Sequence, residues 1–456
     1  MKQRIKSINP ATEEINAEFD LHTVQDIETA LERSVTAHRV LKTWEYDRRA
    51  EVLLKAADLL EENVEEYATT LTREMGKPLS AAKAEVNKCA LLCRHYAEHA
   101  KDYLADRVIK TDASQSYVRY LPIGPVLAVM PWNFPFWQVF RFAAPALMAG
   151  NTCLLKHASN VPQSALAIEK IFLSAGCEEG MFQTLLIDSK DVESILKDTR
   201  VRAATLTGSE GAGAAVAATC GAHIKKTVLE LGGSDPFIIM PSANLDKAVE
   251  KAVTGRIQNN GQSCIAAKRF IIHADIYNDV RDRLVKKFET LNVDDPMNED
   301  TDIGPLATSQ IRDDIAKQVD ESIKVGATCL CGAETVKGKG YFYTPGLLEN
   351  IPKEAPAYRE EFFGPVGLLF KINSLEEAVE LGNTTRFGLG SAIFTQDEGE
   401  IDYAITHLDA GCTFVNQMVA SDPRLPFGGV KASGYGRELS AEGIREFCNI
   451  KTVSIA

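Results

Sequence analysis

The apolar run Val126-Leu127-Ala128-Val129-Met130 decides the fold, because a regular alternation of strand and helix patterns begins with it. A short continuous apolar run of this kind predicts a strand that is buried on both faces. Strand patterns follow at 152–156, 182–187, 203–206 and 227–231, with helical spacing at 137–148, 162–174 and 209–219. Strands that alternate with helices indicate a parallel, doubly wound α/β sheet with helices on both faces.

The alternation resumes after Gly233 and predicts a second α/β domain over 234–432. Its expected strands lie at 237–240, 269–273, 366–372, 391–395 and 413–416. Its expected helices lie at 245–258, 276–291, 310–325, 375–382 and 398–407. The first domain then comprises 1–103 and 123–233, and the segment 433–449 returns to it.

The beginning and the end of the chain stand outside this alternation. Residues 22–102 carry helical spacing, with one helix expected over 47–75, a break at 76–78 and a second helix from 79 onward. Alternating side chains between 103 and 121 predict a β-hairpin that stands apart from the domains. The β-like residues 452–455 are expected to add an edge strand to a neighbouring subunit.

The composition excludes several classes of protein. With 45% hydrophobic and 25% charged residues the chain is globular, and 456 residues suffice for two or three domains. Its net charge of −13 argues against nucleic acid or an anionic membrane as partner. We expect no secretory signal, no membrane span and no metal site. Ten cysteines without disulfide-type spacing favour a reducing cytoplasm.

Cys264 is the candidate nucleophile, and Glu230 is the candidate general base. Cys264 follows Asn259-Asn260-Gly261-Gln262-Ser263, whose small and polar residues favour a turn that presents the thiol. A thiol is the best single-side-chain nucleophile at neutral pH. Glu230 ends an apolar strand pattern and is followed closely by two glycines, where the chain can turn sharply. Taken singly, each also fits an ordinary buried cysteine or a solvated glutamate.

Two strand ends carry features that suit a nucleotide, although no G-x-G-x-x-G fingerprint follows any strand. Thr207-Gly208-Ser209 opens the helix at 209–219, and the N–H groups of a helix N-terminus bind phosphate well. Lys156 and Ser159 follow another strand end. A cation beside a small hydroxyl, in place of a carboxylate, favours the 2′-phosphate of NADP over NAD. A surface lysine beside a helix-capping serine would explain the same pair.

The chain resembles the aldehyde dehydrogenase superfamily over nearly its whole length. Seven motifs occur in that family's order and spacing: Pro131-Trp132-Asn133-Phe134-Pro135, Lys156 with Ser159, Thr207-Gly208-Ser209, Glu230-Leu231-Gly232-Gly233, Gly261-Gln262-Ser263-Cys264, Glu361-Phe362-Phe363-Gly364-Pro365-Val366 and Pro426-Phe427-Gly428-Gly429. The resemblance implies a Rossmann-like cofactor domain (1–103 and 123–233), a catalytic domain (234–432) and a protruding β-hairpin element (104–122 and 450–456). That element implies oligomerisation, as a homodimer or homotetramer.

The resemblance also implies a role for each matching residue. Cys264 attacks the aldehyde to give a thiohemiacetal, Asn133 and the Cys264 N–H stabilise the oxyanion, and hydride transfer to the nicotinamide leaves a thioester. Glu230 then activates the water that hydrolyses it. The cofactor contacts implied are Pro131, Trp132, Lys156, Ser159, Thr207, Gly208, Ser209, Leu231, Glu361 and Phe363. The family's usual glutamate after the lysine is Ser159 here, which favours NADP.

Arg141 suggests which aldehyde is oxidised. It lies eight residues after Asn133 in an otherwise apolar helix pattern, where a cation needs a partner. A substrate carboxylate would supply one, and the succinate-semialdehyde branch of the family has an arginine in this role. Ser263 and Ser421 match further substrate contacts. An internal Asp or Glu paired with Arg141 is the alternative.

The sequence therefore predicts NADP-dependent oxidation of succinate semialdehyde to succinate, with NAD as the alternative cofactor. Glutarate semialdehyde or a neutral aliphatic aldehyde is the alternative substrate. A thiol esterase and a non-catalytic structural protein are alternatives from other classes. The esterase would leave Lys156, Ser209 and Glu361 without a task, and the presence of Cys264 and Glu230 argues against a purely structural protein.

Overall fold

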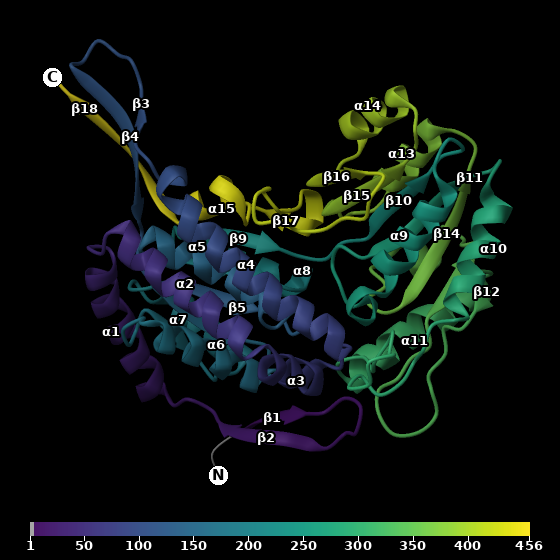
Figure 1. Cartoon of the computed structure of the whole chain (residues 1–456), viewed down its shortest axis with the longest axis horizontal. Coiled ribbons are helices and arrows are strands. Elements are labelled where there is room, and N and C mark those ends of the chain that lie inside the picture. Colours follow the sequence, from purple (N-terminus) through teal and green to yellow (C-terminus); the bar gives the residue numbers. More distant parts are fainter. Residues whose placement is uncertain (1–3) are drawn as a thin grey trace.

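The computed structural model describes residues 4–456, and its first sheet has the strand order β17-β9-β8-β5-β6-β7 (Figure 1). The strands are β5 (Val126–Met130), β6 (Cys153–His157), β7 (Phe182–Thr184), β8 (Ala203–Thr207), β9 (Lys226–Glu230) and β17 (Gly434–Tyr435). The helices between them are α5 (Trp137–Ala149), α6 (Pro162–Ala175), α7 (Val192–Lys197) and α8 (Glu210–Ala222), with a short 3-10 turn η1 (Ser189–Asp191). The pairs are parallel except that β17 joins β9 antiparallel.

The alternation of side chains along β5 explains why both faces of this sheet are covered. Val126, Ala128 and Met130 pack into a core with α2, α4, α5 and α6, whereas Leu127 points to the other face. There it meets residues of α1, α7 and α8. A strand buried on both faces must be apolar at every position, which is what its sequence shows.

The second sheet has the order β12-β13-β14-β11-β10-β15-β16. Its strands are β10 (Asp235–Ile239), β11 (Ala267–His273), β12 (Thr328–Cys331), β13 (Gly346–Glu349), β14 (Val366–Ile372), β15 (Gly390–Phe394) and β16 (Cys412–Val415). Its helices are α9 (Leu245–Ile257), α10 (Tyr277–Phe288), α11 (Ser309–Lys324), α12 (Pro356–Arg359), α13 (Leu375–Asn383) and α14 (Glu398–His407), with the 3-10 turns η2 (Gln258–Gly261) and η3 (Lys431–Ser433). The prediction of two α/β sheets is confirmed.

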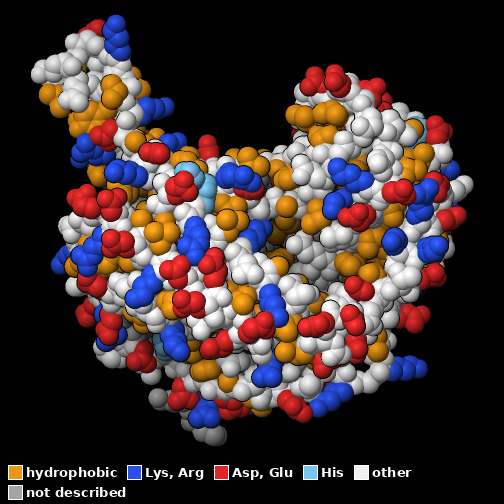
Figure 2. Space-filling model, in the orientation of Figure 1, with side chains coloured by type: hydrophobic (Ala, Val, Ile, Leu, Met, Phe, Trp, Pro, Cys, Tyr) orange, Lys and Arg blue, Asp and Glu red, His pale blue; other side chains and the backbone are white. Residues whose placement is uncertain are grey.

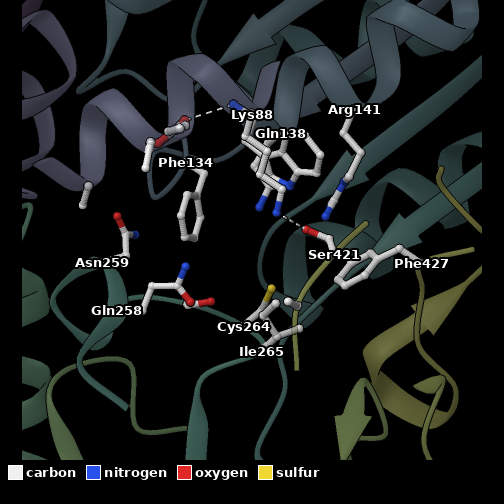
Figure 3. A pocket seen from close by; sticks show the side chains of 16 residues that line it. Lys88, Phe134, Gln138, Arg141, Gln258, Asn259, Cys264, Ile265, Ser421 and Phe427 are labelled. Carbon is white, nitrogen blue, oxygen red and sulfur yellow. Dashed lines mark hydrogen bonds between the residues drawn. The ribbon is translucent and has the colours of Figure 1, made fainter. Parts of the chain in front are cut away.

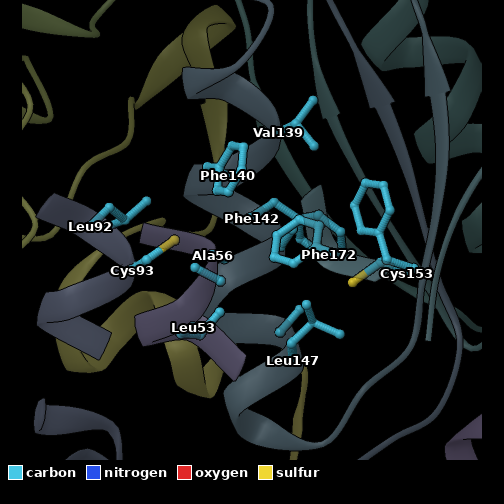
Figure 4. Close-up of a cluster of buried hydrophobic side chains, with 14 of the residues drawn as sticks. Leu53, Ala56, Leu92, Cys93, Val139, Phe140, Phe142, Leu147, Cys153 and Phe172 are labelled. Carbon is cyan, nitrogen blue, oxygen red and sulfur yellow. The ribbon is translucent and has the colours of Figure 1, made fainter. Parts of the chain in front are cut away.

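A helical layer covers one face of the first sheet and encloses the largest core (Figure 4). It comprises α2 (Tyr46–Glu62), α3 (Val64–Met75) and α4 (Leu79–Tyr103), while α1 (Val24–Leu41) packs on the sheet edge and α15 (Ser440–Arg445) contacts α4 and α5. Three aromatic rings form a row within this core. The Phe172 ring centroid lies 5.1 Å from that of Phe140 and 4.8 Å from that of Phe182.

The predicted hairpin protrudes as an arm (Figure 1). It contains β3 (Arg107–Val108), β4 (Gln115–Pro122) and β18 (Cys448–Ile455), and β18 pairs antiparallel with β4 along its whole length. The terminal strand therefore lies in its own chain's arm, where its second edge is free within residues 4–456. Hydrophobic side chains lie on the surface of the arm (Figure 2). They include Val108, Ile109, Ile450 and Ile455.

The structure departs from the sequence predictions in several places, and the largest departures lie in the N-terminal half and at the far side of the second sheet. The single helix expected over 47–75 is two helices, because Asn63 leaves helical geometry and its side-chain amide donates to the Leu59 carbonyl. The sequence analysis missed the hairpin of β1 (Arg4–Ile8) and β2 (Ile15–Asp20), and also β12 and β13. β1, β2 and β12 are largely exposed or half-exposed and so carry little continuous apolar pattern, whereas β13 is buried but has only four residues. No helix within residues 4–456 is long and apolar enough to cross a membrane.

The aromatic row generates a prediction about stability. Phe172→Ala should lower the free energy of unfolding by about 3–5 kcal/mol, because it leaves a cavity among rings that cannot collapse into it. Urea unfolding followed by circular dichroism measures this loss. The matched control is Leu173→Ala on the same helix, which is 40% exposed and should cost less than about 1 kcal/mol. Equal losses in the two variants would contradict the role of the row.

Candidate active site

The Cys264 thiol lies where two hollows meet. One hollow lies at the carboxyl ends of β5, β8 and β9, and Cys264 is part of its lining. The other lies between α4, α5 and the loop after β16, and Cys264 lines it too (Figure 3). We call them the strand-end hollow and the helix-side hollow. A nucleophile at such a junction can meet two different molecules, one from each side.

A strained turn presents this thiol. Asn259, Asn260 and Gly261 all have positive φ, at 59°, 57° and 72°. Consecutive left-handed residues are costly, and asparagine and glycine tolerate them best. At Gly261 a side chain is also excluded, because a Cβ would lie 2.5 Å from the carbonyl of Gly364.

Buried hydrogen bonds hold the turn in place. The Asn260 amide donates to the carbonyls of Gly76 and Pro305, each at 2.9 Å, and accepts from the N–H of Gly304 at 2.9 Å. The Asn259 amide donates to the Asn133 carbonyl at 2.7 Å. The turn therefore joins the loop before α5 to the loop that carries the thiol.

Asn133, the predicted oxyanion donor, is buried beside Cys264 in the strand-end hollow. Its Nδ2 donates to the Gln262 carbonyl at 3.1 Å. A side-chain amide has two N–H groups, so one stays available for an oxyanion. Glu85 on α4 holds the backbone that follows Asn133. Its Oε1 accepts from the backbone N–H groups of Phe136 and Trp137 at 2.8 and 3.0 Å, which caps the start of α5.

The electrostatics around the thiol are mixed. Burial raises the pKa of Cys264 to about 12, although Arg141 and Lys268 favour the thiolate. Lys268 is fully buried in β11, donates to the carbonyls of Ser263 and Cys264 at 2.8 Å, and forms an ion pair with Glu361 at 3.0 Å. The lysine therefore anchors the backbone that carries the sulfur and positions Glu361 on the strand-end hollow.

Glu230, the predicted base, lies at the end of β9 but lines neither hollow in the described part of the chain. Its two carboxylate oxygens are buried and make no hydrogen bond within residues 4–456. Burial first, and the nearby Glu438 second, raise the pKa of Glu230 well above its usual range. An unpartnered carboxylate of raised pKa suits a general base, because it can accept a proton and no hydrogen bond within the described residues holds it in place.

Most of the predicted cofactor residues meet at the strand-end hollow. The predicted residues among its lining are Pro131, Trp132, Thr207, Gly208, Ser209, Leu231, Glu361 and Phe363. The rings of Trp132 and Phe363 meet edge to face, with centroids 5.7 Å apart. These residues come from both sheets, so the hollow bridges the two halves of the molecule.

Lys156 and Ser159 lie at the carboxyl ends of the strands of the same sheet, but outside this hollow. Lys156 is half-buried at the end of β6 and pairs in register with Val129 of β5. Burial lowers the pKa of Lys156, and Asp188 acts against that shift. Ser159 is exposed in the turn that follows.

A third hollow, which the sequence analysis missed, lies beside these strand ends, between α7 and α8. Its apolar lining includes Val129, Leu206 and Val216. The strand-end hollow and this apolar hollow flank the start of α8, where phosphate binds best. The surface therefore fits an extended dinucleotide, with an aromatic and polar end at Cys264 and an apolar end between the helices. No metal-binding cluster of His, Cys, Asp or Glu occurs within residues 4–456.

The predicted substrate residues meet in the helix-side hollow. Arg141, Ser263, Cys264 and Ser421 all line it. Arg141 is buried and forms an ion pair with the buried Glu438, and its guanidinium lies 4.6 Å from the Phe427 ring centroid. The alternative that the sequence left open, an internal acid paired with Arg141, is therefore present in the structure.

Three charged residues of the site were missed by the sequence analysis: Lys88, Lys268 and Glu438. Lys268 had a signal, because it sits with Arg269 inside an apolar strand pattern. Lys88 and Glu438 had none, since each lies far from Cys264 in the chain and reaches the site only through folding.

Known proteins match nearly the whole of this chain. The aldehyde dehydrogenase family profile matches residues 1–453. A relative from Synechocystis, named probable succinate-semialdehyde dehydrogenase [NADP(+)], is 53% identical over 452 residues, covering 99% of this chain and all of that one. A relative from Mycobacterium tuberculosis, named succinate-semialdehyde dehydrogenase [NADP(+)] 1, is 54% identical over 455 residues, covering 99% of this chain and all of that one.

Solved structures share the fold of this chain. The succinic semialdehyde dehydrogenase of Streptococcus pyogenes, in complex with NADP⁺, matches with a TM-score of 0.97 and 37% identity over 99% of each chain. The succinate-semialdehyde dehydrogenase of Burkholderia pseudomallei matches with a TM-score of 0.97 and 32% identity, covering 100% of this chain and 95% of that one. This chain therefore belongs to the aldehyde dehydrogenase family.

Proposed function

We propose that this protein oxidises succinate semialdehyde to succinate with NADP. The observation that carries the proposal is the position of the Cys264 thiol, shared between a hollow built from strand ends and a hollow that contains cationic side chains. The relatives named for this activity support it. Glutarate semialdehyde and neutral aliphatic aldehydes are the substrates against which it must be compared.

The residues divide the work as follows. Cys264 passes its proton to solvent water and attacks the aldehyde carbon as the thiolate. The C=O π bond opens to an oxyanion, which the Asn133 amide and the Cys264 N–H stabilise in the thiohemiacetal. The strand-end hollow would hold NADP, which would supply the acceptor for the hydride that this adduct loses when it becomes a thioester. Glu230 takes a proton from water, whose oxygen attacks the thioester carbon and releases succinate and the thiol. Because Glu230 must swing toward the thioester to do so, its lack of hydrogen-bond partners within residues 4–456 supports this role.

The domain formed by 1–103 and 123–233 binds the cofactor. The domain over 234–432 supplies the Cys264 thiol. Lys156 and Ser159 hold the 2′-phosphate: the lysine is cationic, and the serine adds no negative charge at the sheet edge. Segment 433–449 returns to the first domain, placing β17 beside β9.

The arm (104–122 and 450–456) makes the protein a homodimer or homotetramer. Val108 is 73% exposed and Ile450 58% exposed, and apolar side chains at a free sheet edge favour a second copy as cover. We place the protein in a reducing cytoplasm, because its ten cysteines lack the spacing of a disulfide framework.

A substrate panel tests the function. With NADP, kcat/KM for succinate semialdehyde should exceed that for butanal, a neutral aldehyde with the same number of carbons, by about 10-fold or more. NADPH absorbance measures the rates, and glutarate semialdehyde completes the panel. Cys264→Ala should abolish turnover, while Cys329→Ala, an exposed cysteine on β12, should not. A preference for butanal, or turnover by Cys264→Ala, would refute the proposal.

Glu230→Gln should separate the two halves of the reaction. The first turnover should still give a burst of NADPH, and steady-state turnover should fall by about 100-fold, because thioester hydrolysis lacks its base. In the unchanged protein, hydrolysis should speed up as pH rises through the raised pKa of Glu230, since only the ionised carboxylate accepts a proton. Stopped-flow absorbance measures both phases. Glu250→Gln, an exposed change on α9, is the control, and an unchanged steady-state rate in Glu230→Gln would move the base elsewhere.

Ser159→Glu should move the cofactor preference toward NAD by roughly 10-fold or more, because a carboxylate there repels the 2′-phosphate. The ratio of kcat/KM for the two cofactors measures the shift at a fixed aldehyde concentration. Ser174→Glu, an exposed serine near the end of α6, adds the same charge away from the strand edge and should leave the ratio unchanged. Equal ratios in the unchanged protein, Ser159→Glu and Ser174→Glu would show that Ser159 does not determine the cofactor preference.

A further inference from the structure

Lys88 brings a cation into the helix-side hollow that the sequence did not reveal. It lies on α4 and lines the hollow together with Arg141, Ser421 and Cys264. Its Nζ donates to the Ser421 hydroxyl at 2.8 Å and lies 4.2 Å from the Trp137 ring centroid. Figure 3 shows Lys88, Arg141 and Ser421 gathered on one side of the hollow, with the sulfur of Cys264 facing them.

The other charges at this hollow are already paired. Glu85 forms a buried ion pair with Lys77, and Arg141 forms one with Glu438. Lys88 forms no ion pair with a carboxylate within residues 4–456 and binds only a neutral hydroxyl and an aromatic face. Among the charged side chains that line the hollow, Lys88 is therefore the one without an ion-pair partner within the described residues, and Glu85 and Asp422 attract its charge only from a greater distance.

A half-buried ammonium without a counterion is costly, and such a group needs a ligand of opposite charge. Burial first, and repulsion from Arg141 second, lower the pKa of Lys88 to about 8. A bound carboxylate would supply the close ion-pair partner that Lys88 lacks within the described residues. Arg141 cannot supply that charge alone, because Glu438 neutralises it.

We propose that Lys88 is the specificity-determining cation of the substrate site, binding the carboxylate of a semialdehyde together with Ser421. Arg141 then contributes guanidinium hydrogen bonds and part of the wall of the hollow, while Glu438 neutralises its positive charge. The Ser421 hydroxyl, now bound to Lys88, is held so that ammonium and hydroxyl approach the same carboxylate. This inference rests on the proposed function and names the residue that selects an acidic aldehyde over a neutral one.

The test compares two aldehydes of matched length in variants at position 88. Lys88→Met keeps the length and the apolar stem but removes the charge, and Lys88→Arg keeps the charge. In Lys88→Met we expect KM for succinate semialdehyde to rise roughly 10- to 100-fold, with KM for butanal and kcat for both changing far less. Lys88→Arg should restore part of the preference. Lys83→Met is the matched control, since Lys83 lies on the same helix and pairs with Glu65 at the surface.

The pH profile of the unchanged protein gives a second readout that needs no variant. The ratio of kcat/KM for succinate semialdehyde to that for butanal should fall as pH rises through about 8, because Lys88 loses its charge there. The charged and titratable groups that face it are Glu85 and Cys89 on α4, Arg141 on α5 and Asp422 in the loop after β16. Taking the ratio cancels titrations that affect both aldehydes alike.

The outcomes are distinct. If the unchanged protein does not prefer succinate semialdehyde, the proposed function fails. If it prefers succinate semialdehyde but Lys88→Met weakens both aldehydes equally, or neither, Lys88 has only a structural role and this inference alone is overturned. A ratio that stays flat from pH 7 to pH 10.5, the ordinary pKa of a lysine, would overturn it equally. A selective loss in Lys88→Met with a falling ratio supports it.

Discussion

The active site depends on one backbone constraint, the left-handed turn at Asn259, Asn260 and Gly261. Such a turn is unfavourable alone, so it persists only because the surrounding structure determines it. The hydrogen bonds of Asn260 tie it to Gly76 and Pro305, which belong to segments far apart in the sequence. The turn is thus a product of the assembled fold, and it delivers Cys264 to the junction of the two hollows.

Buried charge is the second organising feature of this site. Lys77, Arg141 and Lys268 are almost fully buried, and each has a carboxylate partner in Glu85, Glu438 or Glu361. Two of the pairs also position nearby backbone. Glu85 caps α5, and Lys268 holds the backbone beside the thiol. A buried pair is weak evidence for stability, so positioning is the better explanation for retaining three of them.

The sequence predicted the sheets well because their strands are buried. β5 and β14 match the expected limits fully, since their apolar runs end sharply at polar or turn residues. Strands such as β1 and β12 were missed because exposed edge strands need no apolar pattern. At the site, the motifs predicted which residues gather around Cys264. They could not predict the partners of Arg141 and Ser421, because Glu438 and Lys88 reach them only through tertiary packing.

One network of charges links the two sides of the thiol. Glu438 pairs with Arg141 on the helix side and also raises the pKa of Glu230 on the strand-end side. While Arg141 neutralises Glu438, ionising Glu230 costs less than it would beside an unpaired carboxylate. Any movement of Arg141 toward a substrate carboxylate would weaken that compensation and hold Glu230 protonated. A separate cation at Lys88 avoids this conflict, because it can bind the substrate while the Arg141–Glu438 pair stays intact and the base stays available.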